Sequence, residues 1–201
     1  MDFLPAAHTW SPHLILIDAD YADSVAFDLT VNFERMIGRR IPPADLPKWL
    51  DCLVLDGGLR PGDNSVQAVF VHRADSTKLR NFRPADFAAD LDGKAFRDNL
   101  GEFTLHSVAM EGPLSPADFF AEAFETLLTS TQIRRLMVVA DMDQHFDRLR
   151  RLAERAPEVE GREVTLFAMA PLPGSRAFRS EILGYSLMAA LGIGSDEIQA
   201  G

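Results

Sequence analysis

Short apolar runs that alternate with amphipathic, helix-like stretches most restrict what this chain can fold into. Five runs are predicted to be strands: Leu14–Ile17, Val66–Val71, Phe103–Val108, Leu136–Val139 and Val164–Met169. The first and fourth runs are continuously apolar, which is typical of strands that are covered on both faces in a parallel sheet. Strands that alternate with helices form βαβ units, and right-handed crossovers then place helices on both faces of the sheet. We therefore predict an α/β protein with a Rossmann-like, three-layer α/β/α arrangement.

The stretches between and after these runs have apolar residues at helical spacing. They are Ala22–Met36, Leu46–Val54, Phe87–Phe96, Phe120–Leu128, Phe146–Ala153 and Phe178–Ala189. The tripeptide Pro-Ala-Asp occurs three times near the start of such a stretch, at Pro43–Asp45, Pro84–Asp86 and Pro116–Asp118. Proline suits the first position of a helix, and an aspartate in the first turn meets the positive end of the helix dipole. Each copy is therefore predicted to begin a helix. No change in composition separates two domains, so residues 1–201 are predicted to form one.

The balance of charged residues limits the class of function. The chain has 201 residues, of which 20 are basic and 30 acidic, and its net charge of −10 excludes a strongly basic nucleic-acid coat protein. The single cysteine, Cys52, excludes an intramolecular disulfide and a multi-cysteine zinc site. No apolar run approaches the roughly 18 residues that a membrane span needs, and Met1–Pro5 contains no basic region typical of a secretory signal. We expect a cytoplasmic protein that has no membrane partner.

Two of the predicted strands end in the same acidic motif. Leu14–Ile17 runs into Asp18-Ala19-Asp20, and the fourth strand runs into Asp141-Met142-Asp143. Ligands of open α/β sheets bind beyond the carboxyl ends of the strands, so neighbouring strands would bring these acids to one site. Clustered carboxylates repel one another, and a divalent cation such as Mg²⁺ or Mn²⁺ removes that repulsion. The alternative interpretation is that each aspartate only caps the helix that follows it.

Two further groups of residues have both a structural and a functional interpretation. Asp118 completes a capping-box-like Ser115-x-x-Asp118, yet it also shares a helical face with Glu122 and Glu125 and is a candidate metal ligand. The arginine clusters stabilise helix carboxyl ends in one interpretation and hold a phosphodiester backbone in the other. Those clusters are Arg35, Arg39 and Arg40; Arg134 and Arg135; and Arg148, Arg150, Arg151 and Arg155. His145, after the second acidic motif, is interpreted as a surface residue.

The two strand ends, Leu-Ile-Leu-Ile-Asp18-Ala-Asp20 and Val-Val-Ala-Asp141-Met-Asp143, resemble those of NYN domains in the PIN-like nuclease superfamily. The resemblance covers about residues 13–170 and leaves residues 171–201 as a helical extension. It implies a mostly parallel five-stranded sheet in the order 3-2-1-4-5. It also implies that Asp18 is the first acid, Asp118 the central acid, and Asp141 and Asp143 the last pair. The implied activity is Mg²⁺- or Mn²⁺-dependent cleavage of RNA by metal-activated water.

The motif departs from the usual NYN pattern, and this keeps alternatives open. Ala140 replaces the usual glycine, Met142 replaces serine, Gln144 replaces an aromatic residue and Asp20 replaces asparagine. One alternative is a catalytically inactive relative that binds a partner or forms a homodimer. The other is a phosphatase of the haloacid dehalogenase type, whose nucleophile and acid Asp18-Ala19-Asp20 also resembles. In the nuclease interpretation Asp18, Asp141 and Asp143 are catalytic, and Asp20 and Asp118 are additional metal ligands.

Overall fold

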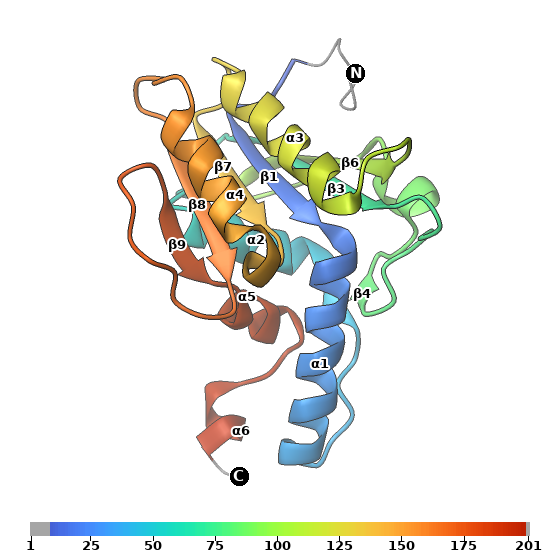
Figure 1. Ribbon diagram of the computed structural model, residues 1–201. Helices are drawn as coiled ribbons and strands as arrows, with labels where there is room; N and C mark the ends of the chain where they lie inside the picture. Colours follow the sequence, from blue (N-terminus) through green and yellow to red (C-terminus); the bar gives the residue numbers. More distant parts are fainter. Residues whose placement is uncertain (1–8, 200–201) are drawn as a thin grey trace.

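The computed structural model describes residues 9–199 and contains a seven-stranded sheet between two layers of helices (Figure 1). The strand order is β5-β6-β3-β1-β7-β8-β9, and every neighbouring pair is parallel except β5 and β6. The strands are β1 (His13–Asp18), β3 (Ser65–Arg73), β5 (Lys94–Asp98), β6 (Gly101–Met110), β7 (Arg135–Val139), β8 (Glu163–Ala168) and β9 (Arg179–Ile182). The prediction of an α/β fold with a mostly parallel sheet is thus confirmed.

The prediction of a five-stranded sheet was wrong, because the sheet has seven strands. The two additional strands, β5 and β9, lie at its edges, in stretches that the sequence pattern predicted to be helical. The stretch Phe87–Phe96 divides into a π-helical turn, η1 (Phe87–Leu91), and β5, with Gly93 between them at a φ of +69°. In β5 only Phe96 is partly buried, where it stacks on Phe103. An exposed edge strand lacks the continuous apolar run of a central strand, so its sequence does not reveal it. The region after residue 170 likewise contains β9, which joins the sheet, and is not wholly helical.

Helices cover both faces of the sheet. They are α1 (Ala19–Ile37), α2 (Leu46–Asp56), α3 (Pro116–Thr129), α4 (Met142–Arg155), α5 (Leu183–Ala190) and α6 (Ser195–Gln199). Along β1, Leu14 and Leu16 pack in the core beneath α3 and α4, whereas Ile15 and Ile17 pack in the core beneath α1, α2 and α5. Both faces of β1 are therefore buried, which explains its continuous apolar sequence. Among residues 9–199, no helix is long and apolar enough to cross a membrane.

The three Pro-Ala-Asp copies begin helices in two different ways. In the third copy Pro116 opens α3 and Asp118 lies in its first turn, as predicted, while Ser115 is the N-cap. In the first two copies the aspartate itself is the N-cap: Asp45 caps α2 and Asp86 caps η1. The prediction of proline at the first helical position was therefore wrong for those two copies. Asp45 lies in β2 (Ala44–Asp45), which pairs with β4 (Phe82–Arg83) outside the main sheet.

Candidate functional site

A cleft of about 380 Å³ lies at the carboxyl ends of the four central parallel strands. Asp18 ends β1, Arg73 ends β3, Met110 ends β6 and Asp141 follows β7. The first turns of α1, α3 and α4 complete the wall, and the three carboxylates in it are Asp18, Asp20 and Asp141. β1 is hydrogen-bonded to both β3 and β7, with Asp18 opposite Val71 and Ile17 opposite Val139. This pairing brings both acidic motifs to the edge where ligands of α/β sheets bind.

Asp18 is an N-cap and also has a strongly perturbed carboxyl group. Its Oδ1 accepts a hydrogen bond from the backbone N–H of Tyr21 at 3.1 Å, which satisfies an amide in the first turn of α1. Burial, together with the charges of Asp20 and Asp141, raises the pKa of Asp18 to about 6. The ionised form is therefore disfavoured here, and a positive charge placed in the cleft would favour it.

Asp141 occupies the equivalent position at the start of α4. Its Oδ1 accepts from the backbone N–H of Asp143 at 3.0 Å, and its Oδ2 accepts from Nε2 of Gln144 at 2.6 Å. The capping interpretation is thus correct for Asp18 and for Asp141. The two interpretations do not exclude each other, because both capping carboxylates also line the shared cleft.

Asp20 connects α1 to the end of β3. Its Oδ2 accepts a hydrogen bond of 2.7 Å from the backbone N–H of Arg73, 53 residues further along the chain. This long-range bond fixes the side chain at the rim of the cleft. Asp20 is therefore not a helix cap, and its position depends on the pairing of β1 with β3.

Tyr21 and Arg73 belong to the cleft and were missed in the sequence. Burial and the charges of Asp141, Asp143 and Asp18 raise the pKa of the Tyr21 phenol to about 12, so the phenol is a neutral hydrogen-bond donor among the acids. The Arg73 guanidinium forms an exposed ion pair with Asp75 at 3.0 Å. Tyr21 directly follows the first acidic motif, and this adjacency was a usable signal. Only the length and register of β3 bring Arg73 to the cleft.

Asp118 and Asp143 do not line the cleft. Asp118 accepts a hydrogen bond from the Ser115 hydroxyl at 2.6 Å and pairs with Arg148 of α4, and both contacts lower the pKa of its carboxyl. Asp143 is exposed on the first turn of α4, although its charge contributes to the raised pKa of Tyr21. The structure therefore brings three of the five predicted acids together in the cleft and leaves two outside its lining.

His145 is a buried part of the cleft wall, so its interpretation as a surface residue was wrong. It is 6% exposed, its ring lies 5.6 Å from that of Phe120, and its backbone N–H donates to the carbonyl of Asp141 at 2.9 Å. Burial lowers the pKa of its imidazole, which favours the neutral ring. The first turn of α4 is amphipathic and directs this residue inward, toward α3.

The acids of the cleft suit a hard cation, but they do not form a complete protein cage. Within residues 9–199, no group of three or more His, Cys, Asp or Glu side chains is arranged to hold a metal ion. Magnesium is often bound through only one or two carboxylates, with water and substrate phosphate as its other ligands. The pair Asp18 and Asp141 fits that manner of binding, since both carboxylates line one cleft and the charge of Asp141 helps to raise the pKa of Asp18.

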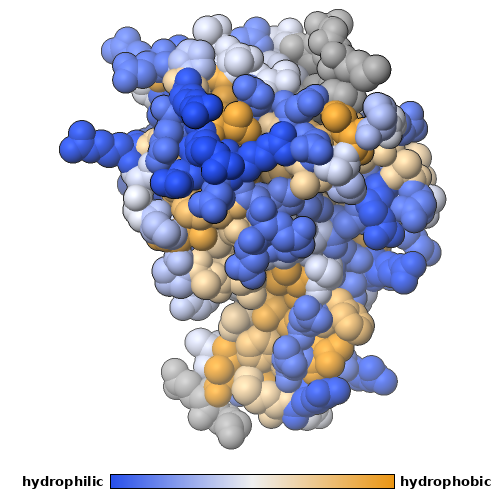
Figure 2. Space-filling model, in the orientation of Figure 1, coloured by the Kyte–Doolittle hydropathy of each residue, from blue (hydrophilic) through white to orange (hydrophobic). Residues whose placement is uncertain are grey.

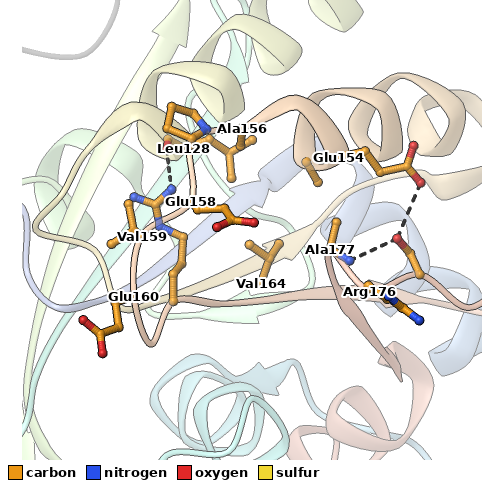
Figure 3. A pocket seen from close by; sticks show the side chains of 13 residues that line it. Leu128, Glu154, Ala156, Glu158, Val159, Glu160, Val164, Arg176 and Ala177 are labelled. Atoms are coloured by element: carbon orange, nitrogen blue, oxygen red, sulfur yellow. Dashed lines mark hydrogen bonds between the residues drawn. The ribbon is translucent and has the colours of Figure 1, made fainter.

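A larger cavity of about 800 Å³ lies elsewhere, at the amino end of β8, and contains none of the predicted site residues (Figure 3). Arg162 in its wall donates to the carbonyls of Leu128 and Ser130, close to the carboxyl end of α3. This arginine satisfies carbonyls that the helix itself leaves free, which is a structural role. Glu158 projects into the same cavity.

The fold and the cleft define an α/β protein with an acidic depression at the carboxyl edge of a mostly parallel sheet. A family model described as a family of unknown function (DUF6621) matches residues 7–198, and the chain belongs to that family. No curated protein and no solved structure matches the chain. The description of that family names no activity.

Proposed function

We propose that the chain is a metal-dependent ribonuclease of the PIN-like type and that the acidic cleft is its active site. The observation that carries this proposal is that Asp18, Asp20 and Asp141, from two acidic motifs more than 120 residues apart in the sequence, line one cleft. The strands formed by the five predicted apolar runs lie side by side as β6-β3-β1-β7-β8, and we interpret this arrangement as the PIN-like order 3-2-1-4-5 with β5 and β9 added at the edges. This agreement of topology and site position supports the PIN-like interpretation.

In this proposal Asp18 and Asp141 hold a Mg²⁺ or Mn²⁺ ion, and Asp20 lies at the rim. The cation supplies positive charge and activates water for attack on a phosphodiester. The raised pKa of Asp18 is the expected state of such a carboxyl without that charge. Asp118 contributes only if Arg148 releases it, and Asp143 only if its exposed side chain turns toward the cleft.

The first test is cleavage of single-stranded RNA in the presence of Mn²⁺ by the wild type and by Asp141→Asn. Asparagine is as good an N-cap as aspartate, so the variant retains the start of α4 while it loses the negative charge. We expect activity to fall at least 100-fold, since a residue that holds the cation supplies several kcal/mol of transition-state stabilisation. The matched control is Asp28→Asn, on the exposed face of α1. Undiminished cleavage by Asp141→Asn would remove the assignment.

A catalytically inactive, partner-binding relative is the second candidate. It is favoured by the local contacts of the acids, because Asp18 and Asp141 each cap a helix and Asp118 is engaged by Arg148. If this candidate is right, calorimetric titration with Mn²⁺ gives no binding heat and the wild type does not cleave RNA. Light scattering would then show whether the partner is a second copy.

The alternative of a phosphatase of the haloacid dehalogenase type requires a lysine that binds the phosphate group of the substrate. None of Lys48, Lys78 and Lys94 lines the cleft.

A further inference from the structure

We propose that the loop between β3 and η1, residues 74–86, binds the phosphate backbone of single-stranded RNA through Lys78, Arg80 and Arg83 and leads it into the acidic cleft. We call this segment the basic loop. The choice of RNA as ligand rests on the proposed function, whereas the position and charge of the basic loop stand independently of it. A hollow of about 730 Å³, formed by residues of the basic loop and by Asp90 of η1, is lined by all three basic residues.

The basic loop is a fixed platform for these side chains. Leu79 and Phe82 are buried in the core beneath α1 and α2, and Phe82 packs on Trp49 with 5.0 Å between the ring centroids. The backbone N–H of Leu79 donates to the carbonyl of Ala85 at 3.0 Å, so the two sides of the loop are joined. With these apolar residues turned inward, the basic residues beside them are held outward.

Two hydrogen bonds place the basic loop against the wall of the cleft. Asp20, at the cleft rim, accepts from the backbone N–H of Arg73, where the loop begins. One helical turn later, Asp23 accepts from the backbone N–H of Asn81 at 2.8 Å, between Arg80 and Phe82. The first two turns of α1 therefore carry the acidic cleft and also anchor the basic loop. Figure 1 shows the segment with β4 beside the upper part of α1.

The positive charges of the basic loop are not neutralised by ion pairs. Lys78, Arg80 and Arg83 are exposed, and none of them forms a salt bridge with another residue of the described part of the chain. The two carboxylates in the same hollow are occupied by backbone amides: Asp86 accepts from Ala88 and Ala89, and Asp90 accepts from Ala85 and Asp86.

The distribution of charge favours a polyanionic ligand with a flexible backbone. The chain has a net charge of −10, so a nucleic acid is repelled except where basic residues gather without partners. The cleft beyond the basic loop, at about 380 Å³, is near the lower limit of small-ligand pockets and is too small to admit a double helix. A single strand can lie with its phosphates on the basic loop and place one nucleotide in the cleft.

The test is fluorescence anisotropy of a labelled oligouridylate of about 15 nucleotides, measured in EDTA so that cleavage does not contribute. The variant is Lys78→Gln/Arg80→Gln/Arg83→Gln. The matched control, Arg60→Gln/Lys94→Gln/Arg176→Gln, removes the same charge from exposed residues that line neither the cleft nor the hollow of the basic loop. We expect the first variant to bind roughly 10-fold more weakly than the control, and its log–log salt dependence to become less steep by about 2.

Equal affinities of the two variants would overturn the proposal, as would absence of RNA binding by the wild type. Competition by duplex RNA or by polyglutamate as strong as that by single-stranded RNA would overturn the choice of ligand.

Because Arg83 also donates to the carbonyls of Arg80 and Phe82, the double variant Lys78→Gln/Arg80→Gln tests the charge with those bonds intact. Binding in EDTA without any cleavage in Mn²⁺ would remove the ribonuclease and retain the basic loop. Cleavage of RNA in Mn²⁺, together with RNA binding by the triple variant that equals that of the control, would retain the ribonuclease and remove the basic loop.

Discussion

At the scale of single residues, identical side chains acquire opposite properties from their surroundings. Asp18 and Asp118 both occupy starts of helices, and both resembled metal ligands in the sequence. Burial beside other acids raises the pKa of Asp18, whereas Ser115 and Arg148 lower the pKa of Asp118. Spacing along the chain identified these residues as candidates, but only their neighbours in space decide whether the carboxylate favours an added cation.

Asp51 provides a residue-scale prediction that is independent of the cleft. Burial and the neighbouring carboxyl of Asp98 raise the pKa of Asp51 to about 7, and its Oδ1 is buried with no hydrogen-bond partner among the described residues. A raised carboxyl pKa favours the folded state below the unfolded pKa, and this stability is lost as the pH rises through the folded pKa. The wild type should therefore lose stability between about pH 4 and pH 7 relative to Asp51→Asn.

The measurement is urea unfolding of the wild type and Asp51→Asn at both ends of that pH range. At pH 8 the variant should be more stable by about 1–2 kcal/mol, a value reduced for solvent screening because the residue is only partly buried. Near pH 4 the difference should largely disappear. The exposed Asp28→Asn is the control, and an equal gain there, or a gain for Asp51→Asn that does not depend on pH, would contradict the mechanism.

At the scale of elements, local signals located the central strands and most of α1 to α4, whereas edge elements depended on their neighbours. The continuously apolar β1 and β7 were predicted because both of their faces are buried. β5 and β9 were missed because their sequences carry no such pattern, and they become strands only by pairing with β6 and β8. Their assignment is a consequence of tertiary contact rather than of propensity.

The contact between α2 and α5 gives a prediction at this scale. The indole N–H of Trp49 donates to the Ser186 hydroxyl at 3.1 Å, and both residues are buried. Ser186→Ala leaves the indole donor unsatisfied and should lower the free energy of unfolding by about 1–3 kcal/mol. In the Trp49→Phe background the same serine substitution should cost much less, because no indole donor remains.

Chemical denaturation of the four proteins in this double-mutant cycle gives the coupling energy directly. A serine substitution that costs the same in both backgrounds would show that the hydrogen bond contributes nothing.

At the scale of the whole molecule, the carboxyl-terminal elements are part of the domain. α5 buries Leu183 and Leu187 in the core that α1 and α2 also share, and Arg39, two residues after the end of α1, pairs with Glu197 of α6 at 2.7 Å. Figure 2 shows apolar side chains over the lower part of the molecule, where the second half of α1 and the carboxyl-terminal helices lie. The exposed apolar residues include Phe27 and Met36 of α1.

Truncated chains test whether the carboxyl-terminal helices are part of the same cooperatively folded domain. A chain that ends after residue 182 loses α5, exposes the apolar face of α2, and should fail to unfold cooperatively in thermal circular dichroism. A chain that ends after residue 194 loses only α6 and should retain a cooperative transition at a lower temperature. Cooperative, wild-type-like unfolding of the shorter chain would show that the carboxyl-terminal region is a separate attachment.

The sequence by itself determined the α/β class, the central strands and the approximate positions of α1 to α4, because apolar periodicity and capping residues act within a few positions. It also identified both acidic motifs. Tertiary structure alone decided that Asp18, Asp20 and Asp141 share a cleft with Tyr21 and Arg73, and that Asp118 pairs with Arg148. The physical reason is that pairing of β1 with β3 and β7, and packing of α3 on α4, set distances between residues that are far apart along the chain.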